Sequence, residues 1–516
     1  MSNVYLVLII AIALLLRVYD LANNPIALNQ DEAINGYDAY SLITTMGDHH
    51  GNFMPIMLES FGDWVSPVIT YITIPFVQLL GLSEFSIRLP VALLGVGTVV
   101  LIYLFSLQVF NDKKLALIAA FFLAIMPWHI TLSRWAIPPS IVPFFLLLFM
   151  TVFLGAIKNN SKEPYYKFIL ASLCAGILTY SYPTQKLFVP LLLIALSVIF
   201  LRKNITKITI FLSSYIIFVS PLYLITLADP NRYNSRFKFV SIFRPGENIF
   251  MILGKFLLRY LSYFSPEFNF GISDSNIMQR VPGFGANYDF LSVFFYIGIL
   301  GCFTLVLKKD NLTYPHRQII LLLLAWLLIA PIPASLTETY YHTLRMIHGL
   351  PLTIIFVVFG LKIIVNSLKD IQIKNKLILV IIFLGIMNIP SFSYVYFYRY
   401  PQQTLTREMF QYGIKDFMNY VITNQDRFAK IVIDNQINQP YIYYLFYSKY
   451  DPKLINHLEI QPDKEIKTIG KYEFRNIDNQ EIIDTQEIYK VNDENRIWYK
   501  IYERNDQVLF VKKVTY

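Results

Sequence analysis

Two adjacent carboxylates beside an apolar segment are the first feature of the chain that could do chemistry. Asp31 and Glu32 lie in the polar stretch 29–37, which follows the apolar run 4–21. Carboxylates close to a membrane surface are costly to desolvate, so their presence needs a reason. One explanation is structural, with Asp31 as the N-cap of a helix and Glu32 in its first turn. The other is chemical, because a carboxylate held there could act as a general base towards a hydroxyl group.

Four basic side chains stand near the ends of apolar runs, beside proline or aromatic residues. They are Arg88, Arg134, Lys186 and Arg345. Each alone is typical of an interfacial anchor at a membrane boundary. Together, on the same side of a membrane as the carboxylates, they would form a cationic patch suited to the phosphate of a membrane-held substrate. Arginine binds phosphate through two parallel hydrogen bonds, whereas Lys186 would act as a point charge.

The composition indicates which kind of structure must position these groups. Of 516 residues, 55% are hydrophobic and only 15% are charged, against roughly 25% charged in soluble proteins. Apolar runs long enough for membrane spans recur up to about residue 394, which predicts an all-α polytopic membrane protein. Intrinsic disorder, collagen, a coiled coil and a water-soluble enzyme are excluded. The net charge of +9 does not indicate nucleic-acid binding, because the basic residues punctuate the apolar runs and do not form one face.

Eleven membrane spans are expected. They cover residues 4–21, 89–110, 115–131, 140–157, 167–182, 187–201, 208–227, 289–307, 318–334, 347–365 and 377–394. The first is taken as a retained span, since it lacks the positive n-region of a signal peptide. Residues 66–80 contain Pro75 and are too short to cross about 30 Å of hydrocarbon, so they are expected to form a helix at the membrane interface.

The basic residues also set the expected orientation, because short loops rich in Lys and Arg stay cytoplasmic. With eleven spans and a cytoplasmic N-terminus, the cytoplasmic loops hold Lys113, Lys114, Lys158, Lys162, Lys167, Arg202, Lys203, Lys207, Lys308, Lys309, Arg317, Lys369, Lys374 and Lys376. The short loops on the other side hold one basic residue each. The long loops 22–88 and 228–288, and everything after residue 394, are then outside a plasma or inner membrane.

Polar residues become more frequent after residue 394. Residues 430–434 and 508–511 have the pattern of strands, and residues 408–423 have that of a helix. We therefore expect a membrane domain over residues 1–394 and a small extracytoplasmic α/β domain over residues 395–516.

The motifs that could indicate a metal site, a nucleotide site or a disulfide have ordinary structural explanations. Asp48-His49-His50 could supply half a metal site, but a polar turn explains it better. Gly95-Val96-Gly97 lies inside an apolar span, so helix packing is favoured over a dinucleotide loop. Cys174 and Cys302 lie in apolar segments and are expected as small buried hydrophobic residues.

Asp31-Glu32 after the first span is the first of several segments that come in a familiar order and spacing. The others are Ser83-Glu84-Phe85-Ser86-Ile87-Arg88-Leu89-Pro90, Pro127-Trp128-His129, Leu132-Ser133-Arg134, Tyr180-Ser181-Tyr182 and Tyr260-Leu261-Ser262-Tyr263-Phe264-Ser265-Pro266-Glu267-Phe268. In these segments the chain resembles glycosyltransferase family 39, the group of protein O-mannosyltransferases and aminoarabinose transferases that share the GT-C fold. The resemblance covers most of the membrane region.

The resemblance implies an inverting transfer of a mannose-like sugar from a polyprenyl-phosphate donor to a hydroxyl of an acceptor protein, lipid or glycan at the external membrane face. It implies that Asp31 is the base and that Glu32 supports it. The donor phosphate would be held by Arg134, Lys186, Arg345 and Arg88. The residues expected to line the substrate site are Tyr37, Asp63, Tyr180 and Tyr182.

The chain departs from the family pattern in two places. Many relatives carry a further acid after the arginine that closes the third span, where this chain has Ala-Ile-Pro-Pro at residues 136–139. A Lys-Pro-Pro or His-Pro-Pro element common in relatives is replaced by residues 64–67, which leaves Asp63 as the nearby substitute. Both departures weaken the case for a divalent metal.

Two other classes of protein remain to be weighed. A transporter or lipid flippase without covalent chemistry would have ionisable residues at mid-membrane and paired broken helices. The spans are nearly free of charge at their centres, which favours the enzyme. A membrane-anchored scaffold would leave Asp31 and Glu32 exposed and unpaired with any cation.

Overall fold

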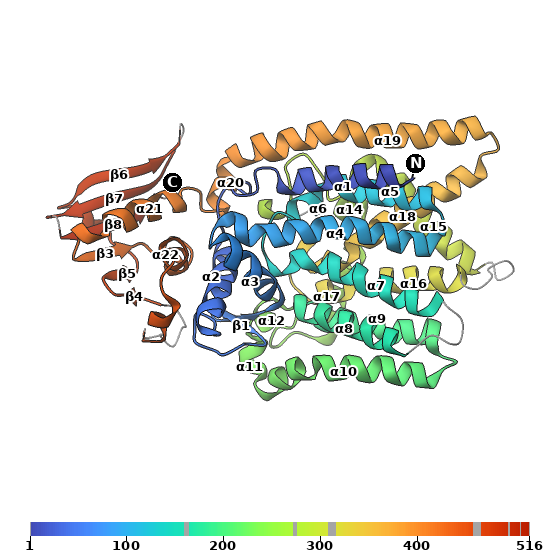
Figure 1. Cartoon of the computed structure of the whole chain (residues 1–516), viewed down its shortest axis with the longest axis horizontal. Helices are drawn as coiled ribbons and strands as arrows, with labels where there is room; N and C mark the ends of the chain where they lie inside the picture. Colours follow the sequence, from blue (N-terminus) through green and yellow to red (C-terminus); the bar gives the residue numbers. More distant parts are fainter. Residues whose placement is uncertain are drawn as a thin grey trace. The chain divides into compact units, whose positions relative to one another are not determined.

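The computed structural model describes residues 2–158, 165–271, 276–307, 316–457, 466–493, 496–505 and 507–514. The chain divides into two compact units, each described here by itself (Figure 1). The first unit comprises Met1–Tyr19, Val91–Arg134 and Pro138–Tyr400, and the second comprises Asp20–Pro90, Trp135–Ile137 and Pro401–Tyr516. The predicted division into domains 1–394 and 395–516 stays a prediction.

Long helices make up the first unit and lie side by side in a bundle (Figure 1). They are α1 (Ser2–Val18), α4 (Glu84–Phe110), α5 (Lys113–Ile125), α7 (Val142–Lys158), α8 (Tyr166–Ser181), α9 (Gln185–Leu196), α10 (Ile205–Ala228), α15 (Ser292–Leu307), α16 (His316–Ile329), α18 (Leu350–Ser367) and α19 (Ile371–Tyr394). The unit also contains the shorter helices α6 (Pro127–Leu132), α11 (Pro230–Tyr233), α12 (Ser235–Val240), α13 (Ile249–Ser262), α14 (Pro266–Asn269) and α17 (Pro331–Ser335).

These helices agree with a multi-pass membrane protein. Each of the eleven predicted spans contains one of the long helices, although prolines divide two of them, at Pro127 and Pro331. Seven helices among the described residues are long and apolar enough to cross a membrane, and others are shorter. The count of eleven crossings therefore stays a prediction. Of the lysines used to orient the chain, Lys162, Lys308 and Lys309 lie outside the described residues.

Glycines allow two helices of the bundle to approach closely. A Cβ at Gly298 of α15 would lie 2.0 Å from the carbonyl oxygen of Phe356 in α18. A Cβ at Gly360 of α18 would lie 1.9 Å from the carbonyl oxygen of Phe294. Small residues at such a crossing let the backbones meet, which is how helices pack where lipid gives no hydrophobic driving force between them.

The second unit begins with the long loop after the first span. It contains α2 (Gln30–Thr45), the antiparallel strands β1 (Leu58–Ser60) and β2 (Asp63–Val65), and α3 (Val68–Leu80). The helix α3 coincides with the one predicted for the membrane interface and has Pro75 inside it. At 13 residues it is about 20 Å long, too short to cross a bilayer.

The C-terminal part of the second unit is a mixed sheet with helices, as predicted. The six strands are ordered β4-β5-β3-β8-β7-β6, and β3 is parallel to both of its neighbours. Their bounds are β3 (Lys430–Ile433), β4 (Thr468–Ile469), β5 (Tyr472–Phe474), β6 (Gln486–Asn492), β7 (Ile497–Arg504) and β8 (Val508–Lys513). The two predicted strands are β3 and β8, so both predictions are confirmed.

The prediction of a single helix over residues 408–423 is wrong. The chain forms α20 (Thr404–Met409) and α21 (Ile414–Asn424), with a third helix, α22 (Pro440–Ser448), further on. The break falls at Gln411 and Gly413, which have φ angles of 55° and 86°. Left-handed backbone cannot continue a right-handed helix, and glycine adopts it without steric cost.

Candidate functional site

The helix α2 carries the two carboxylates in its first turn, and its cap differs from the predicted one. The side-chain oxygen of Asn29 accepts a hydrogen bond from the Glu32 amide at 2.9 Å, and the Glu32 carboxylate accepts one from the Asn29 amide at 3.3 Å. This reciprocal capping box satisfies two amides that the helix itself leaves without partners. The predicted helix start is therefore confirmed, but Asn29 is the N-cap and Asp31 lies one position inside the helix.

Glu32 is fully buried and forms a two-point ion pair with Arg88. The distances are 2.8 Å from Arg88 Nε to Glu32 Oε1 and 2.9 Å from Nη2 to Oε2. The amide of Ala136 also donates to Oε1, at 3.1 Å. Neither side chain is exposed to solvent. Because the carboxylate is buried, the guanidinium and the backbone amides take the place of water as its hydrogen-bond partners.

The other hydrogen bonds of Arg88 go to backbone carbonyl groups of the chain that leads from the first span to α2. Its guanidinium donates to the carbonyl oxygens of Leu21, Ala22, Pro25 and Ala27, at 2.8 to 3.3 Å. Because the guanidinium is enclosed and its donors are used in this way, its geometry suits positioning of Glu32. We therefore leave Arg88 out of the phosphate site proposed below.

Asp31 differs from Glu32 in its exposure. It is the neighbouring residue in the same first turn, yet it is partly exposed where Glu32 is fully buried. The helix N-terminus carries partial positive charge, which stabilises an ionised carboxylate. The structure thus separates the two acids into one that is locked into the protein and one that solvent reaches.

The helix α22 packs against α2 close to these acids. Burial, together with nearby Tyr499 and then Asp31 and Glu32, holds the pKa of Tyr443 well above its usual range. The Tyr443 hydroxyl accepts a hydrogen bond from Gln411 Nε2 at 2.8 Å. No sequence pattern pointed to Tyr443, because it lies more than 400 residues from the acids and in another kind of segment.

Tyr37, predicted to line the substrate site, is buried one helical turn beyond the acids. Its hydroxyl donates to the carbonyl oxygen of Tyr450 at 2.7 Å. Beside it, a Cβ at Gly36 would lie 2.7 Å from an Ile87 side-chain atom and 2.9 Å from one of Phe446. Both residues therefore fix α2 against its neighbours in the second unit.

A second acidic cluster lies around His49. Its Nδ1 and Asp38 Oδ1 are 2.7 Å apart, and the His49 amide also donates to that oxygen, at 2.9 Å. Both side chains are buried, and the ring of His50 lies 3.9 Å from that of His49. Burial lowers the pKa of His49, but Asp38, Asp48 and Glu59 outweigh it, so the pKa is raised overall. Asp63, the predicted substitute acid, is partly buried in β2 and accepts from the Trp64 amide at 2.8 Å.

Two of the predicted phosphate-binding cations come from neighbouring elements of the first unit. Lys186 lies in the first turn of α9, and Arg345 lies in the 3-10 helix Thr343–Gly349. Gln185 Nε2 and His348 Nδ1 are 3.1 Å apart and join these two elements. Both cations are partly exposed.

The other predicted residues of the first unit are placed differently. Arg134 is fully buried, donates to the Leu16 carbonyl oxygen at 3.2 Å, and has its guanidinium 4.9 Å from the ring centre of Phe397. Tyr180 and Tyr182, at the end of α8, are partly exposed. The Tyr180 hydroxyl points to the carbonyl oxygen of Phe218 at 3.4 Å.

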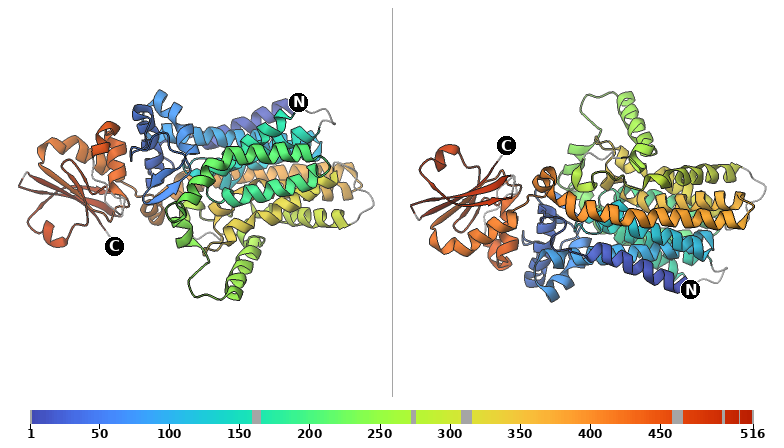
Figure 2. Two further views of the ribbon diagram at one scale, coloured as in Figure 1. Left: turned by 90° about the horizontal axis from the view of Figure 1, so that it is seen from below. Right: turned by 90° about the horizontal axis from the view of Figure 1, so that it is seen from above.

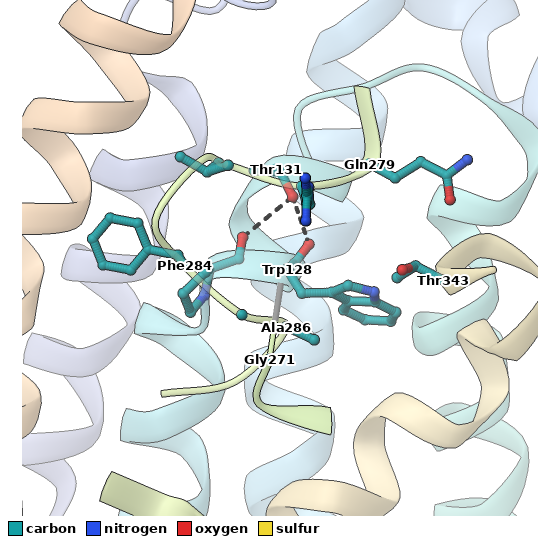
Figure 3. A pocket seen from close by; sticks show the side chains of 11 residues that line it. Trp128, Thr131, Gly271, Gln279, Phe284, Ala286 and Thr343 are labelled. Atoms are coloured by element: carbon teal, nitrogen blue, oxygen red, sulfur yellow. Dashed lines mark hydrogen bonds between the residues drawn. The ribbon is translucent and has the colours of Figure 1, made fainter. Parts of the chain in front are cut away.

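A hollow opens next to the element that carries Arg345. It is lined by Pro127, Trp128, Thr131, Gly271, Gln279, Arg280, Val281, Phe284, Gly285, Ala286 and Thr343. Figure 3 shows the indole of Trp128 and the side chain of Thr343 on the same side of it. Gln279 Oε1 accepts from the Leu344 amide at 3.4 Å, which ties the lining to the Arg345 helix. An aromatic ring with amide and guanidinium groups is a lining that suits a sugar or phosphate group. Of these lining residues, only Pro127 and Trp128 belong to the segments that carry the family resemblance.

Among the described residues, no group of three or more His, Cys, Asp or Glu side chains is arranged to hold a metal ion.

Comparison with known proteins bears out the resemblance. Residues 7–228 match the family described as "Dolichyl-phosphate-mannose-protein mannosyltransferase". A curated protein of Bacillus subtilis (strain 168), "Putative mannosyltransferase YkcB", is 29% identical over 161 residues, which are 31% of this chain and 21% of that protein. The chain thus spans about a fifth of that relative.

Solved structures share the fold. ArnT from Cupriavidus metallidurans, bound to undecaprenyl phosphate, has a TM-score of 0.54 at 12% identity, with 90% of each chain covered. The oligosaccharyltransferase of Archaeoglobus fulgidus, tethered to an acceptor peptide, has a TM-score of 0.50 at 13% identity, covering 87% of this chain and 63% of that one. At these identities the likeness shows the GT-C fold alone, and the predicted fold class is confirmed.

Replacing Glu32 by Ala should destabilise the protein by about 3–5 kcal/mol, because Arg88 would keep a buried charge without its partner. The Tm of the detergent-solubilised protein, followed by scanning fluorimetry, should fall by many degrees. Glu487→Ala is the matched control: it breaks a pair with Lys500 at 2.7 Å in which the side chains are 36% and 30% exposed. Such pairs contribute about 0–1 kcal/mol. Equal losses of Tm in the two variants would contradict a structural role for Glu32.

The pair of His49 and Asp38 should make stability depend on pH. A raised histidine pKa contributes stability that is fully present below the unfolded value of about 6.5 and is lost as pH rises through the folded pKa. The Tm advantage of the natural chain over His49→Gln should therefore be largest in weak acid and shrink towards alkaline pH.

His342 offers a control of opposite sign. Burial and the neighbouring Arg345 lower the pKa of His342 to about 3. The advantage of the natural chain over His342→Gln should thus grow as pH rises from weak acid to about 6.5 and level off above it. If the His49→Gln difference were flat across the same range, the charged pair with Asp38 would be ruled out.

Proposed function

We propose that this chain, whose residues 7–228 match the mannosyltransferase family and whose bundle has the GT-C fold, transfers a mannose-like sugar from a polyprenyl-phosphate donor to an acceptor hydroxyl. The observation that carries the proposal is the separation of the two acids in the first turn of α2. Glu32 is locked to Arg88, and Asp31 beside it is partly exposed. A transferase of this kind needs one ionised carboxylate held in place where an acceptor can reach it.

In the proposed reaction, Asp31 takes the proton of the acceptor hydroxyl. The hydroxyl oxygen forms a bond to the anomeric carbon while the bond from that carbon to the phosphate oxygen breaks. Polyprenyl phosphate leaves with the electron pair, and attack from the opposite side inverts the anomeric configuration. Glu32 does not touch the substrate in this scheme. It positions Asp31 by fixing the start of the helix through Arg88 and Ala136.

Lys186 and Arg345 are assigned to the donor phosphate. They come from elements joined by the Gln185 and His348 side chains, and both are partly exposed. Cations there would neutralise the negative charge that grows on the departing phosphate. Arg134 would contribute from a buried position. The ArnT structure with the same fold was solved with undecaprenyl phosphate, which supports a lipid phosphate as the leaving group.

The remaining predicted residues complete the proposal. Tyr180, Tyr182 and Asp63 are assigned to the substrate, as the resemblance implies, and the hollow lined by Trp128 and Arg280 is the place assigned to the sugar. The basic loops support a reaction at the extracytoplasmic face of a plasma or inner membrane, where the loops 22–88 and 228–288 and the C-terminal domain would also lie. The acceptor is a hydroxyl-bearing protein, lipid or glycan.

Asp31→Asn should lower sugar transfer at least about 100-fold, because a positioned base contributes roughly 10²–10⁴ to the rate. Purified protein in detergent is incubated with a panel of polyprenyl-phosphate monosaccharides, and released polyprenyl phosphate is measured by mass spectrometry. Asp451→Asn, an exposed acid of the same unit, is the control and should retain full activity. An Asp31→Asn variant that keeps full activity with an unchanged Tm would refute the assigned base.

Lys186→Ala and Arg345→Ala should each raise the donor concentration needed for half-maximal rate by roughly 10- to 100-fold, since a hydrogen bond to a charged group is worth about 1.5–3 kcal/mol. The same assay is run over a range of donor concentrations. Arg202→Ala removes an exposed arginine predicted for the cytoplasmic face and serves as the control. An unchanged donor dependence in both variants would remove these residues from the phosphate site.

A further inference from the structure

The helix α13 presents a bare apolar face. Its 14 residues place large apolar side chains along one side, with Phe250 78% and Leu258 62% exposed. The exposed set is Ile249, Phe250, Met251, Leu253, Leu257, Leu258 and Leu261. Just before the helix, Phe237, Phe239 and Phe243 are exposed as well. So much apolar surface in one short stretch is unusual unless something covers it.

The opposite side of α13 is tied to the protein through its charged residues. The guanidinium of Arg259, the one buried residue of the helix, donates to the carbonyl oxygen of Glu338 at 3.1 and 3.0 Å. It also lies 4.8 Å from the ring centre of Tyr340. Lys255 pairs with Glu247 at the start of the helix. These contacts fix the rotation of α13, so the apolar side faces outward by construction.

The position of α13 fits a membrane surface and not a span. The helix lies in the segment between the end of α10 at Ala228 and the start of α15 at Ser292. At 14 residues it measures about 21 Å, short of the hydrocarbon thickness of about 30 Å. Both views in Figure 2 show it standing away from the bundle and across the direction of the long helices.

The charge of this segment indicates which kind of membrane surface it would bind. Residues 229–262 contain six basic residues and two acidic ones, Asp229 and Glu247. The basic residues are Arg232, Arg236, Lys238, Arg244, Lys255 and Arg259. The first four are exposed. Amphipathic helices that combine bulky apolar residues with Lys and Arg bind in the interfacial plane of a bilayer, and anionic headgroups strengthen the binding.

We infer that residues 229–262 form an interfacial anchor, with the apolar face of α13 embedded at the headgroup level of the bilayer and the exposed basic residues bound to anionic phospholipids. The anchor holds the loop between α10 and α15 against the leaflet at that end of the bundle. It is independent of the reaction proposed above, because none of its residues belongs to the assigned site.

The test measures where the apolar face lies. The full chain carrying Leu258→Cys is labelled with an environment-sensitive fluorophore and reconstituted into phosphatidylcholine vesicles with or without phosphatidylglycerol. The natural cysteines are both buried. Lipids with a spin label on the acyl chain should quench the fluorophore several-fold more than one at Asp484→Cys, an exposed position in the C-terminal sheet region. The quenching should increase with phosphatidylglycerol.

Two further variants test the role of charge. Arg232→Gln/Arg236→Gln/Lys238→Gln should abolish the gain from phosphatidylglycerol. Lys113→Gln/Lys114→Gln/Lys203→Gln, which removes three exposed lysines predicted for the other face, should leave it intact. Water-like emission without quenching at position 258 would overturn the inference. So would disulfide cross-linking of two Leu258→Cys chains in the membrane, which would make the face an interface between copies. Equal quenching with and without phosphatidylglycerol would overturn the anionic preference.

Discussion

The buried pair of Glu32 and Arg88 is the interaction on which the arrangement of the candidate site depends. The two residues are 56 positions apart, and neither is exposed to solvent. Taking both charges out of water costs several kcal/mol per ion unless the geometry is good and the remaining hydrogen-bonding groups are satisfied. Here both conditions hold, because the carboxylate also accepts from the amides of Asn29 and Ala136 and the guanidinium also donates to backbone carbonyls. The pair therefore joins three separate stretches of the chain at one point, the first turn of α2.

That constraint gives neighbouring carboxylates different roles. Successive residues of an α-helix point about 100° apart, so a helix start that aims Glu32 into the protein turns Asp31 towards another side. The residue types alone do not distinguish the two adjacent acids, and only the family resemblance gives them different roles. In the structure the Glu32 carboxylate is paired with the Arg88 guanidinium, and its neighbour Asp31 is partly exposed to solvent. A scaffold with both acids exposed and unpaired, as the third hypothesis required, does not fit this arrangement.

The sequence predicted most of the membrane helices and two of the strands, because hydrophobic runs and alternation are local patterns. It did not predict the pairing of Arg88 with Glu32, since an arginine at the end of an apolar run looks the same whether it anchors at the interface or pairs inside the protein. It also missed α13, in which Lys255 and Arg259 interrupt the apolar residues so that the stretch fits neither a span nor a polar loop. The break between α20 and α21 depended on the backbone at Gly413, where the space on one side is set by Val491 from a distant strand. In each of these three regions the structure depends on contacts between residues that are far apart in the chain.

Residues of the C-terminal region contact the helix that carries the two acids. The Tyr37 hydroxyl reaches the carbonyl of Tyr450, and Gly36 leaves room for Phe446 where a Cβ would come within 2.9 Å. Tyr443 lies close enough to both acids for their charges to raise its pKa. A module added only to bind a partner would not need contacts with the helix that carries the proposed base. Since α2 is held on one side by Arg88 and on another by α22, the C-terminal region helps to fix the helix that carries the proposed base.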